Sequence, residues 1–198
     1  MIIAPSFRTS RLSFRATQPE DVALFSRMFS DEATLFGCTA APCTPWSNKS
    51  AESFMKFCGE ATMSLVFYLD PDSENTDVKE EAVGWIVLDE EFKGGPHQRA
   101  SSGISLMKEY QGKGYGKEAM EFMLETAFLR YNFHRVECDV YAWNEPALRL
   151  YKSVGFVEEG RRRKSLFQQG EWRDEYLLAI LQTDWRAAHT DRLQLEQP

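Results

Sequence analysis

Three glycines in alternate positions stand where a predicted strand gives way to a predicted helix. They belong to the run at 111–116, which reads Gln-Gly-Lys-Gly-Tyr-Gly, and residues 104–107 before it indicate a strand end. After it, apolar residues recur from Met120 at the i, i+3, i+4, i+7 spacing of an amphipathic helix. Glycine tolerates positive φ and close approach of a ligand, and a first helical turn offers unpaired N–H groups. The run therefore predicts a phosphate or pyrophosphate site.

The spacing of these glycines narrows the choice of phosphate ligand. A Walker loop needs Ser or Thr after Gly-Lys, whereas Gly112-Lys113 is followed by Gly114. The dinucleotide fingerprint G-x-G-x-x-G needs one more residue than this run provides. A nucleotide-dependent phosphate enzyme is therefore disfavoured. The run matches Gln/Arg-x-x-Gly-x-Gly/Ala instead.

That loop, with Asn144 and the segment 147–156 (ALRLYKSVGF) in the same order, resembles the GNAT superfamily of acetyl-CoA-dependent N-acetyltransferases. The opening Arg-Leu-x-x-Arg at 11–15 and the late segment 159–174 resemble the branch that acetylates ribosomal-protein N-termini or polyamines. The resemblance implies acetyl-CoA as the cofactor, with its pyrophosphate wrapped by the glycine loop. It implies transfer of acetyl to a primary amine by direct attack, without a metal.

The hydrophobic pattern predicts an α/β (α+β) fold. Strands are expected at 10–15, 63–69, 82–88, up to 107, at 135–142 and in a closing hairpin within 156–181, with helices at 17–29, around 54–58, after 116 and after 144. Residues 36–48 are expected to form a loop and 70–81 an acidic turn region. The resemblance implies a mixed, mostly antiparallel sheet of six or seven strands, flanked by helices and splayed between strands 4 and 5. We expect one domain over 8–185 and a polar C-terminal tail over 186–198.

The resemblance assigns roles to particular positions. The expected cofactor contacts are Leu106, Met107, Gln111, Gly112, Lys113, Gly114, Tyr115, Gly116 and Asn144. Within this set, a backbone N–H of Leu106 or Met107 would hold the oxyanion. Asn is also a favoured helix cap, and a cap uses the side-chain oxygen and leaves the amide nitrogen for a ligand.

Tyr151 is the expected catalytic acid. In the family, the tyrosine of Tyr-x-x-x-Gly-Phe points its hydroxyl at the departing sulfur, and a proton donated there assists the thiolate. Periodicity alone gives an alternative, because Tyr151 lies on an apolar helix face with Leu150 and Val154 and such a tyrosine is commonly part of the core.

The general base is not evident. Many family members carry glutamate two residues before the position of Gly103, and here that residue is Ser101. Asp89, Glu90, Glu91 and His97 are alternatives, and a water chain is the default because it needs no specific carboxylate. The absent glutamate keeps a second function open, a non-catalytic acyl-CoA-binding module.

Charge and cysteine usage limit the partners. The chain has 198 residues and a net charge of −7, which disfavours nucleic acid and favours a cationic acceptor, with Asp174 and Glu175 as candidates to hold it. We expect a small-molecule amine or a peptide N-terminus, and leave a homodimer open. Four cysteines without a C-x-x-C pair indicate reduced thiols in the cytoplasm or nucleus. No apolar run approaches the ~18 residues of a membrane span.

Overall fold

Seven strands form a single sheet in the computed structural model, which describes residues 7–70, 81–90 and 93–190. The spatial order is β1-β2-β3-β4-β5-β7-β6. The strands are β1 (Leu12–Ala16), β2 (Met63–Leu69), β3 (Ala82–Asp89), β4 (Arg99–Leu106), β5 (Arg135–Tyr141), β6 (Val157–Gln168) and β7 (Glu171–Leu181). All neighbouring strands are antiparallel except β4 and β5, which are parallel. The predicted mixed, mostly antiparallel sheet is confirmed.

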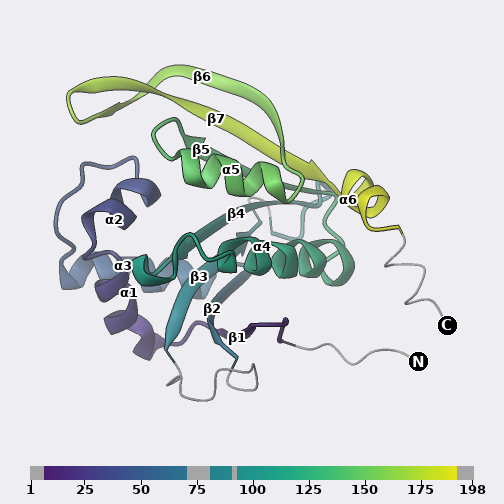
Figure 1. Ribbon diagram of the computed structural model, residues 1–198, viewed down its shortest axis with the longest axis horizontal. Helices are drawn as coiled ribbons and strands as arrows, with labels where there is room; N and C mark the ends of the chain where they lie inside the picture. Colours follow the sequence, from purple (N-terminus) through teal and green to yellow (C-terminus); the bar gives the residue numbers. More distant parts are fainter. Residues whose placement is uncertain (1–6, 71–80, 91–92, 191–198) are drawn as a thin grey trace.

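Helices cover both faces of this sheet. They are α1 (Val22–Met28), α2 (Glu32–Cys38), α3 (Asn48–Glu60), α4 (Tyr115–Glu125), α5 (Glu145–Ser153) and α6 (Gln182–Ala188). Figure 1 shows α1, α2 and α3 gathered at one end of the molecule, while α4 crosses the sheet and contacts β1, β3 and β4. The face covered by α1–α3 and the face covered by α4 each have their own apolar core.

Strand β3 is buried on both faces, which explains its continuous apolar sequence. Ile86 and Leu88 pack into the core beneath α4, and Trp85 and Val87 pack into the core beneath α1 and α3. Side chains of a strand alternate between its two faces, so both faces of β3 require apolar residues. This central strand holds the two helical layers together.

Strands β4 and β5 separate over their second halves. Their pairing ends at Ser101 opposite Glu137, although β4 continues to Leu106. The Met107 N–H donates to the Val83 carbonyl at 2.9 Å, and antiparallel ladders alternate bonded and non-bonded pairs. The N–H groups of Ile104 and Leu106 therefore face away from β3 and toward the split. The predicted splay between strands 4 and 5 is confirmed.

Two segments differ from expectation. Helix α2 occupies the start of the region predicted as a loop, because Asp31 caps it by accepting from the Thr34 N–H at 2.9 Å. Helix α6 runs through the first residues of the expected tail, and its Trp185 is buried and stacks on His189. The prediction that a tail begins at residue 186 is therefore wrong for residues 186–188, which belong to the helix. Residues 191–198, and 71–80 of the expected acidic turn, lie outside the described part of the chain.

No helix among the described residues is long and apolar enough to cross a membrane.

Candidate active site

The glycine loop enters α4 in a conformation that few residues other than glycine adopt. Gly114 precedes the first residue of α4 with φ of +85°, and Gly112 has φ of +72°. A left-handed residue at this point turns the chain sharply, so the first N–H groups of α4 follow directly on the loop. These groups have no partner inside the helix and carry its partial positive charge. The left-handed glycines and the helix start that the glycine spacing predicts are therefore present.

A partly buried carboxylate on α4 connects this loop to the start of β1. Glu118 accepts hydrogen bonds from the Thr9 hydroxyl at 2.5 Å and from the Arg11 N–H and Nε at 2.8 and 2.7 Å. The Arg11 Nη1 also donates to the Lys113 carbonyl at 3.2 Å, and its guanidinium lies 4.7 Å from the centre of the Tyr115 ring. Burial raises the pKa of Glu118, but these hydrogen bonds outweigh it and leave the pKa lowered. Nothing in the sequence pattern singles out Glu118.

The side chains of the loop serve partly to hold it in place. Gln111 donates from Nε2 to the Leu106 carbonyl at 3.1 Å and to the Thr34 hydroxyl at 3.2 Å, which ties the loop to β4 and α2. The Lys113 side chain is exposed, and its Nζ lies 5.5 Å from the centre of the Tyr110 ring. The contacts of Gln111 are therefore structural, and Lys113 is free to reach a ligand over the loop.

Gly116 and Met107 lie deeper than a ligand-contacting role requires. A Cβ on Gly116 would meet side-chain atoms of Leu106 and Leu150 at 3.3 Å, so the glycine permits close packing of α4. Met107 is buried and its N–H is bonded to Val83. The expectation of Met107 as an oxyanion donor is therefore not met, and Leu106 is the candidate whose N–H faces the split.

Asn144 joins α5 to α2. Its Oδ1 accepts from the Ala147 N–H at 3.1 Å, which is the expected helix cap, and its Nδ2 donates to the Gly37 carbonyl at 2.9 Å. The amide nitrogen expected to be free is thus already bonded to the protein. One N–H of that group remains for a ligand.

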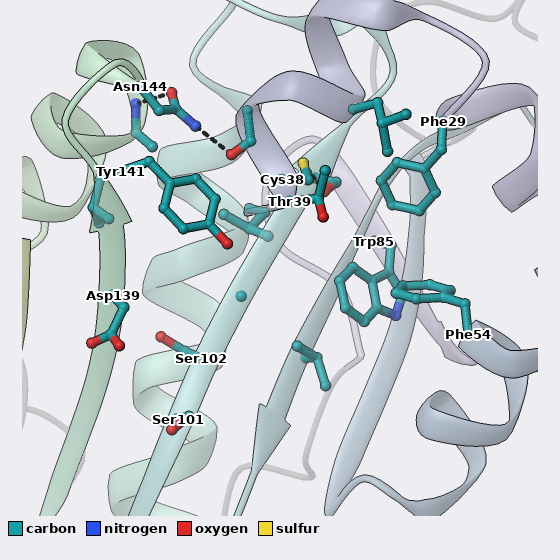
Figure 2. A pocket seen from close by; sticks show the side chains of 18 of the residues that line it. Phe29, Cys38, Thr39, Phe54, Trp85, Ser101, Ser102, Asp139, Tyr141 and Asn144 are labelled. Carbon is teal, nitrogen blue, oxygen red and sulfur yellow. Dashed lines mark hydrogen bonds between the residues drawn. The ribbon is translucent and has the colours of Figure 1, made fainter. Parts of the chain in front are cut away.

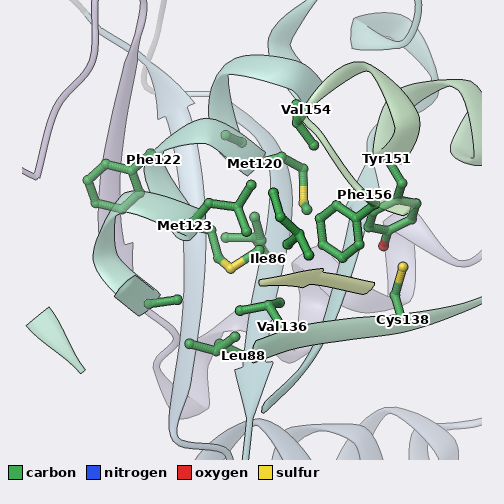
Figure 3. Close-up of a cluster of buried hydrophobic side chains, with 14 of the residues drawn as sticks. Ile86, Leu88, Met120, Phe122, Met123, Val136, Cys138, Tyr151, Val154 and Phe156 are labelled. Carbon is green, nitrogen blue, oxygen red and sulfur yellow. The ribbon is translucent and has the colours of Figure 1, made fainter. Parts of the chain in front are cut away.

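Tyr151 belongs to both the core and the site. It is buried, packs edge-on against Phe156 and directs its hydroxyl at the Cys138 sulfur (Figure 3). It also lines the cavity that opens from the split. Burial, followed by the neighbouring Cys138 and Cys38, raises the pKa of Tyr151 well above its usual range. The phenol is therefore protonated at neutral pH, as an acid must be before it donates.

A cavity of about 470 Å³ occupies the open end of the split (Figure 2). Residues 101–105 of β4 line it, with Tyr141 and Asp139 of β5 on one side and Trp85, Phe54 and Phe29 on the other. The alternation along 135–142 predicts that Tyr141 lies on the exposed face of β5. Tyr141 nevertheless lines the cavity, because β4 has separated from β5 at this level. No local pattern in the sequence indicates this placement.

Of the four candidates for the base, Asp89 is the one that lines the cavity within the described residues. It pairs with Ser101 across the ladder, and its Oδ1 accepts from the Thr62 N–H at 3.3 Å. His97 and Glu90 do not line the cavity, and Glu91 lies outside the described residues.

A cysteine that the sequence pattern did not single out also lines the cavity. The Cys38 sulfur lies 3.0 Å from the Ser105 hydroxyl, at the point where α2 approaches β4. Cys38 is exposed at the cavity, and partial desolvation by the surrounding residues raises the pKa of its thiol, which stays protonated at neutral pH. Cys38 therefore contributes a neutral, weakly polar surface to the site.

The two candidate carboxylates on the closing hairpin, Asp174 and Glu175, already accept hydrogen bonds from arginines of the protein. Asp174 accepts from Arg161 Nε at 2.5 Å and from the Lys164 N–H at 2.7 Å. Glu175 accepts from Arg162 Nη1 at 2.8 Å. Neither residue lines the cavity. The expectation that these carboxylates hold the acceptor is therefore not supported.

A family model described as an acetyltransferase (GNAT) domain matches residues 11–157. The chain belongs to the GNAT family of N-acetyltransferases, enzymes that move an acetyl group from acetyl-CoA to an amine. An uncharacterized N-acetyltransferase of Bacillus subtilis, YokL, from the SPbeta prophage, is 26% identical over 180 residues, covering 90% of this chain and 94% of that protein.

Polyamine enzymes are also among its relatives. The spermidine N(1)-acetyltransferase of Vibrio cholerae is 33% identical over 89 residues, which cover 45% of this chain and 51% of that protein. A crystal structure of the Vibrio cholerae spermidine N-acetyltransferase with CoA and spermine superposes with a TM-score of 0.74 at 24% identity, covering 89% of this chain and 99% of that chain. At that identity the likeness shows the fold alone.

Proposed function

We propose that this chain transfers acetyl from acetyl-CoA to a primary amine in the split between β4 and β5. The observation that carries the proposal is the continuity of three features. The start of α4 follows Gly114, the N–H groups of Ile104 and Leu106 face the split beyond the last β4–β5 pair, and the cavity opens from that split. The pyrophosphate would lie on the loop 111–116 and the pantetheine arm in the split. The chemistry of the loop fits this group, since its N–H groups suit a diphosphate.

The residues around the split divide the reaction between them. The neutral amine attacks the thioester carbonyl carbon, a C–N bond forms, and the carbonyl oxygen becomes an oxyanion within reach of the Leu106 N–H. The C–S bond then breaks, the sulfur takes a proton from Tyr151, and the nitrogen gives up its extra proton to water. Return of that proton to the phenol balances the cycle. Asp89 lies where it can receive a proton from the amine through water.

A protein that only binds acyl-CoA would share the loop but lack turnover. Ser101 in place of the family's glutamate is the observation in its favour. The presence of Tyr151 beside the cavity argues for catalysis, because a protein that only binds acyl-CoA has no use for a proton donor there.

The test measures binding and turnover on the same protein. Acetyl-CoA in large excess over its Kd should raise the melting temperature, because a ligand that binds the folded state alone stabilises it, by about 2.7 kcal/mol at 100 times Kd. Release of free thiol should follow when a panel of primary amines is added. A shift without thiol release from any amine would support the binding module. No shift with acetyl-CoA, but one with ATP and Mg²⁺, would overturn the cofactor.

A further inference from the structure

The acceptor end of the cavity has an aromatic wall, formed by Phe29, Trp46, Phe54, Phe57 and Trp85. The rings contact one another: Trp46 lies 4.4 Å from Phe29 and 5.5 Å from Phe54 between ring centres, and Phe54 lies 4.9 Å from Trp85. Phe29 and Trp85 are buried, but Trp46 and Phe54 are half-buried and Phe57 is 39% exposed. The wall therefore leaves apolar surface open to the cavity.

The carboxylates at the cavity already have cationic neighbours. Of the described residues that line it, Asp89 and Asp139 are the acidic ones. Asp139 accepts from Arg162 Nη1 at 2.8 Å, and Asp89 lies 3.9 Å from Lys93 Nζ. An acceptor with several separated ammonium groups would compete with these cations for each carboxylate. An acceptor with one amino group and an apolar body meets no such competition.

We infer that the acceptor is a small monoamine whose reactive nitrogen is joined by a short chain to an aromatic body. The inference rests on the proposed function and names its substrate class. The body would pack among Trp46, Phe54 and Trp85, and the nitrogen would lie over Gly103 of β4, which also lines the cavity. A cavity of about 470 Å³ suits a small molecule of this kind.

The same wall bears on how the amine loses its proton in a site where Ser101 replaces the glutamate and Asp89 could act only through water. An alkyl ammonium has a pKa near ~10.4 and has no lone pair with which to attack. Apolar surroundings disfavour the charged form and lower the pKa of a bound ammonium. The wall therefore raises the fraction of neutral amine in a site where Ser101 cannot remove the proton. The released proton goes to solvent, and the neutral nitrogen then attacks as above.

The first experiment compares kcat/KM for 2-phenylethylamine, tryptamine, ethylamine, spermidine and a short peptide beginning with Phe. The arylalkylamines should exceed ethylamine and spermidine by about tenfold or more, since one buried methylene alone is worth ~10-fold or more in a fitted pocket. Spermidine as the best substrate would overturn the inference, because ring faces also attract ammonium groups. So would turnover of the peptide above that of both arylalkylamines, or equal turnover of ethylamine.

The second experiment removes part of the wall. Trp46→Ala should raise KM for 2-phenylethylamine about tenfold, from the loss of aromatic contact, and leave KM for ethylamine unchanged. Trp172→Ala is the matched control, because Trp172 is exposed on β7 and contacts Phe167, away from the cavity. An equal rise in both variants, or none in Trp46→Ala, would overturn the inference.

A folding control and the full amine panel distinguish failure of the variant, of the proposed function and of the acceptor class. The acetyl-CoA thermal shift reports whether Trp46→Ala is folded, and if it is not, Phe57→Ala removes a more exposed ring of the same wall. If no amine in the panel releases thiol, the proposed function fails. If ethylamine or spermidine reacts and the arylalkylamines do not, the acceptor class alone fails.

Discussion

The two ends of the cleft are built in opposite ways. The end that we propose for the cofactor is a run of six adjacent residues, 111–116, and its geometry comes from backbone conformation at Gly112 and Gly114. The acceptor end collects aromatic side chains from residues 29 to 85, carried by α3, β3 and the chain around α1 and α2. One end offers main-chain N–H groups to a ligand, and the other offers ring surfaces.

This difference predicts how ligand binding at each end should respond to amino-acid substitution. Backbone recognition tolerates side-chain substitution but not the loss of a required φ value. Side-chain recognition tolerates substitution of one ring with a graded loss, because several rings share the contact. Substitutions at the loop, at Tyr151 and at Glu118 probe this contrast, from the largest expected effect to the smallest.

Gly114→Val should abolish the thermal shift produced by acetyl-CoA. A β-branched residue resists a φ of +85° and places methyl groups where the pyrophosphate would approach. Gly94→Val is the matched control: Gly94 has φ of +70°, and a Cβ added there would meet no atom within 4 Å, so it carries similar strain away from the cleft. Thermal melts with and without acetyl-CoA measure both. A wild-type thermal shift with acetyl-CoA in Gly114→Val would contradict the comparison. It would show that binding at this end does not depend on the backbone conformation of Gly114.

Tyr151→Phe should lower kcat by about 10²-fold, the lower range for a positioned general acid. The change removes one hydroxyl and keeps the ring against Phe156, so cofactor binding should persist. Because the proton is given only in the transition state, kcat and kcat/KM should fall together if chemistry limits turnover.

The control for that change is Tyr131→Phe, which removes the hydroxyl of an exposed tyrosine that does not line the cavity and that donates to the Thr62 carbonyl. Steady-state kinetics and thermal melts on both variants separate the two roles of Tyr151. A Tyr151→Phe enzyme that is less stable but within about twofold of wild-type kcat would make it a core residue. Coenzyme A would then leave as a thiolate, which a thiol pKa near ~8.5 allows.

Glu118→Gln should cost about 1–3 kcal/mol of unfolding free energy at neutral pH, the cost of removing a charged hydrogen-bond partner. The pKa of Glu118 is lowered in the folded state, so its contribution is present above the unfolded pKa of about 4.5 and is lost as pH falls through the folded value. The difference between wild type and variant should therefore shrink in acid. Glu121→Gln, on the exposed face of the same helix, is the control.

Urea unfolding at pH 7 and at pH 3 measures this difference. Equal losses at the two pH values would show that the carboxylate charge does not fasten the loop to residues 9–11. A smaller thermal shift with acetyl-CoA in Glu118→Gln would sharpen the comparison. It would show that the contacts of Glu118 with residues 9–11 support the conformation of the glycine loop.

Local patterns predicted most of the elements. Residues 63–69 are rich in Leu, Val, Phe and Tyr, which favour a strand, and β2 has those bounds; Asn144 caps α5 as expected. Helix α2 was not predicted because its seven residues, Glu32–Cys38, include a glycine and are followed by two prolines. Its stability comes from the Asp31 cap and from packing on β4, and the second of these is not a local property.

What the sequence determined by itself was the conformation of the glycine loop, since glycine spacing acts through the conformation of adjacent residues. It also determined the order of the strands and helices around that loop, since apolar periodicity is local. Tertiary structure alone decided that Glu118 binds residues 9–11, that Met107 turns its N–H to Val83, and that Asp89 rather than His97 meets the cavity. Those outcomes depend on contacts between residues distant in the chain. Strand register and helix packing set such contacts, and neither is encoded in any short run of residues.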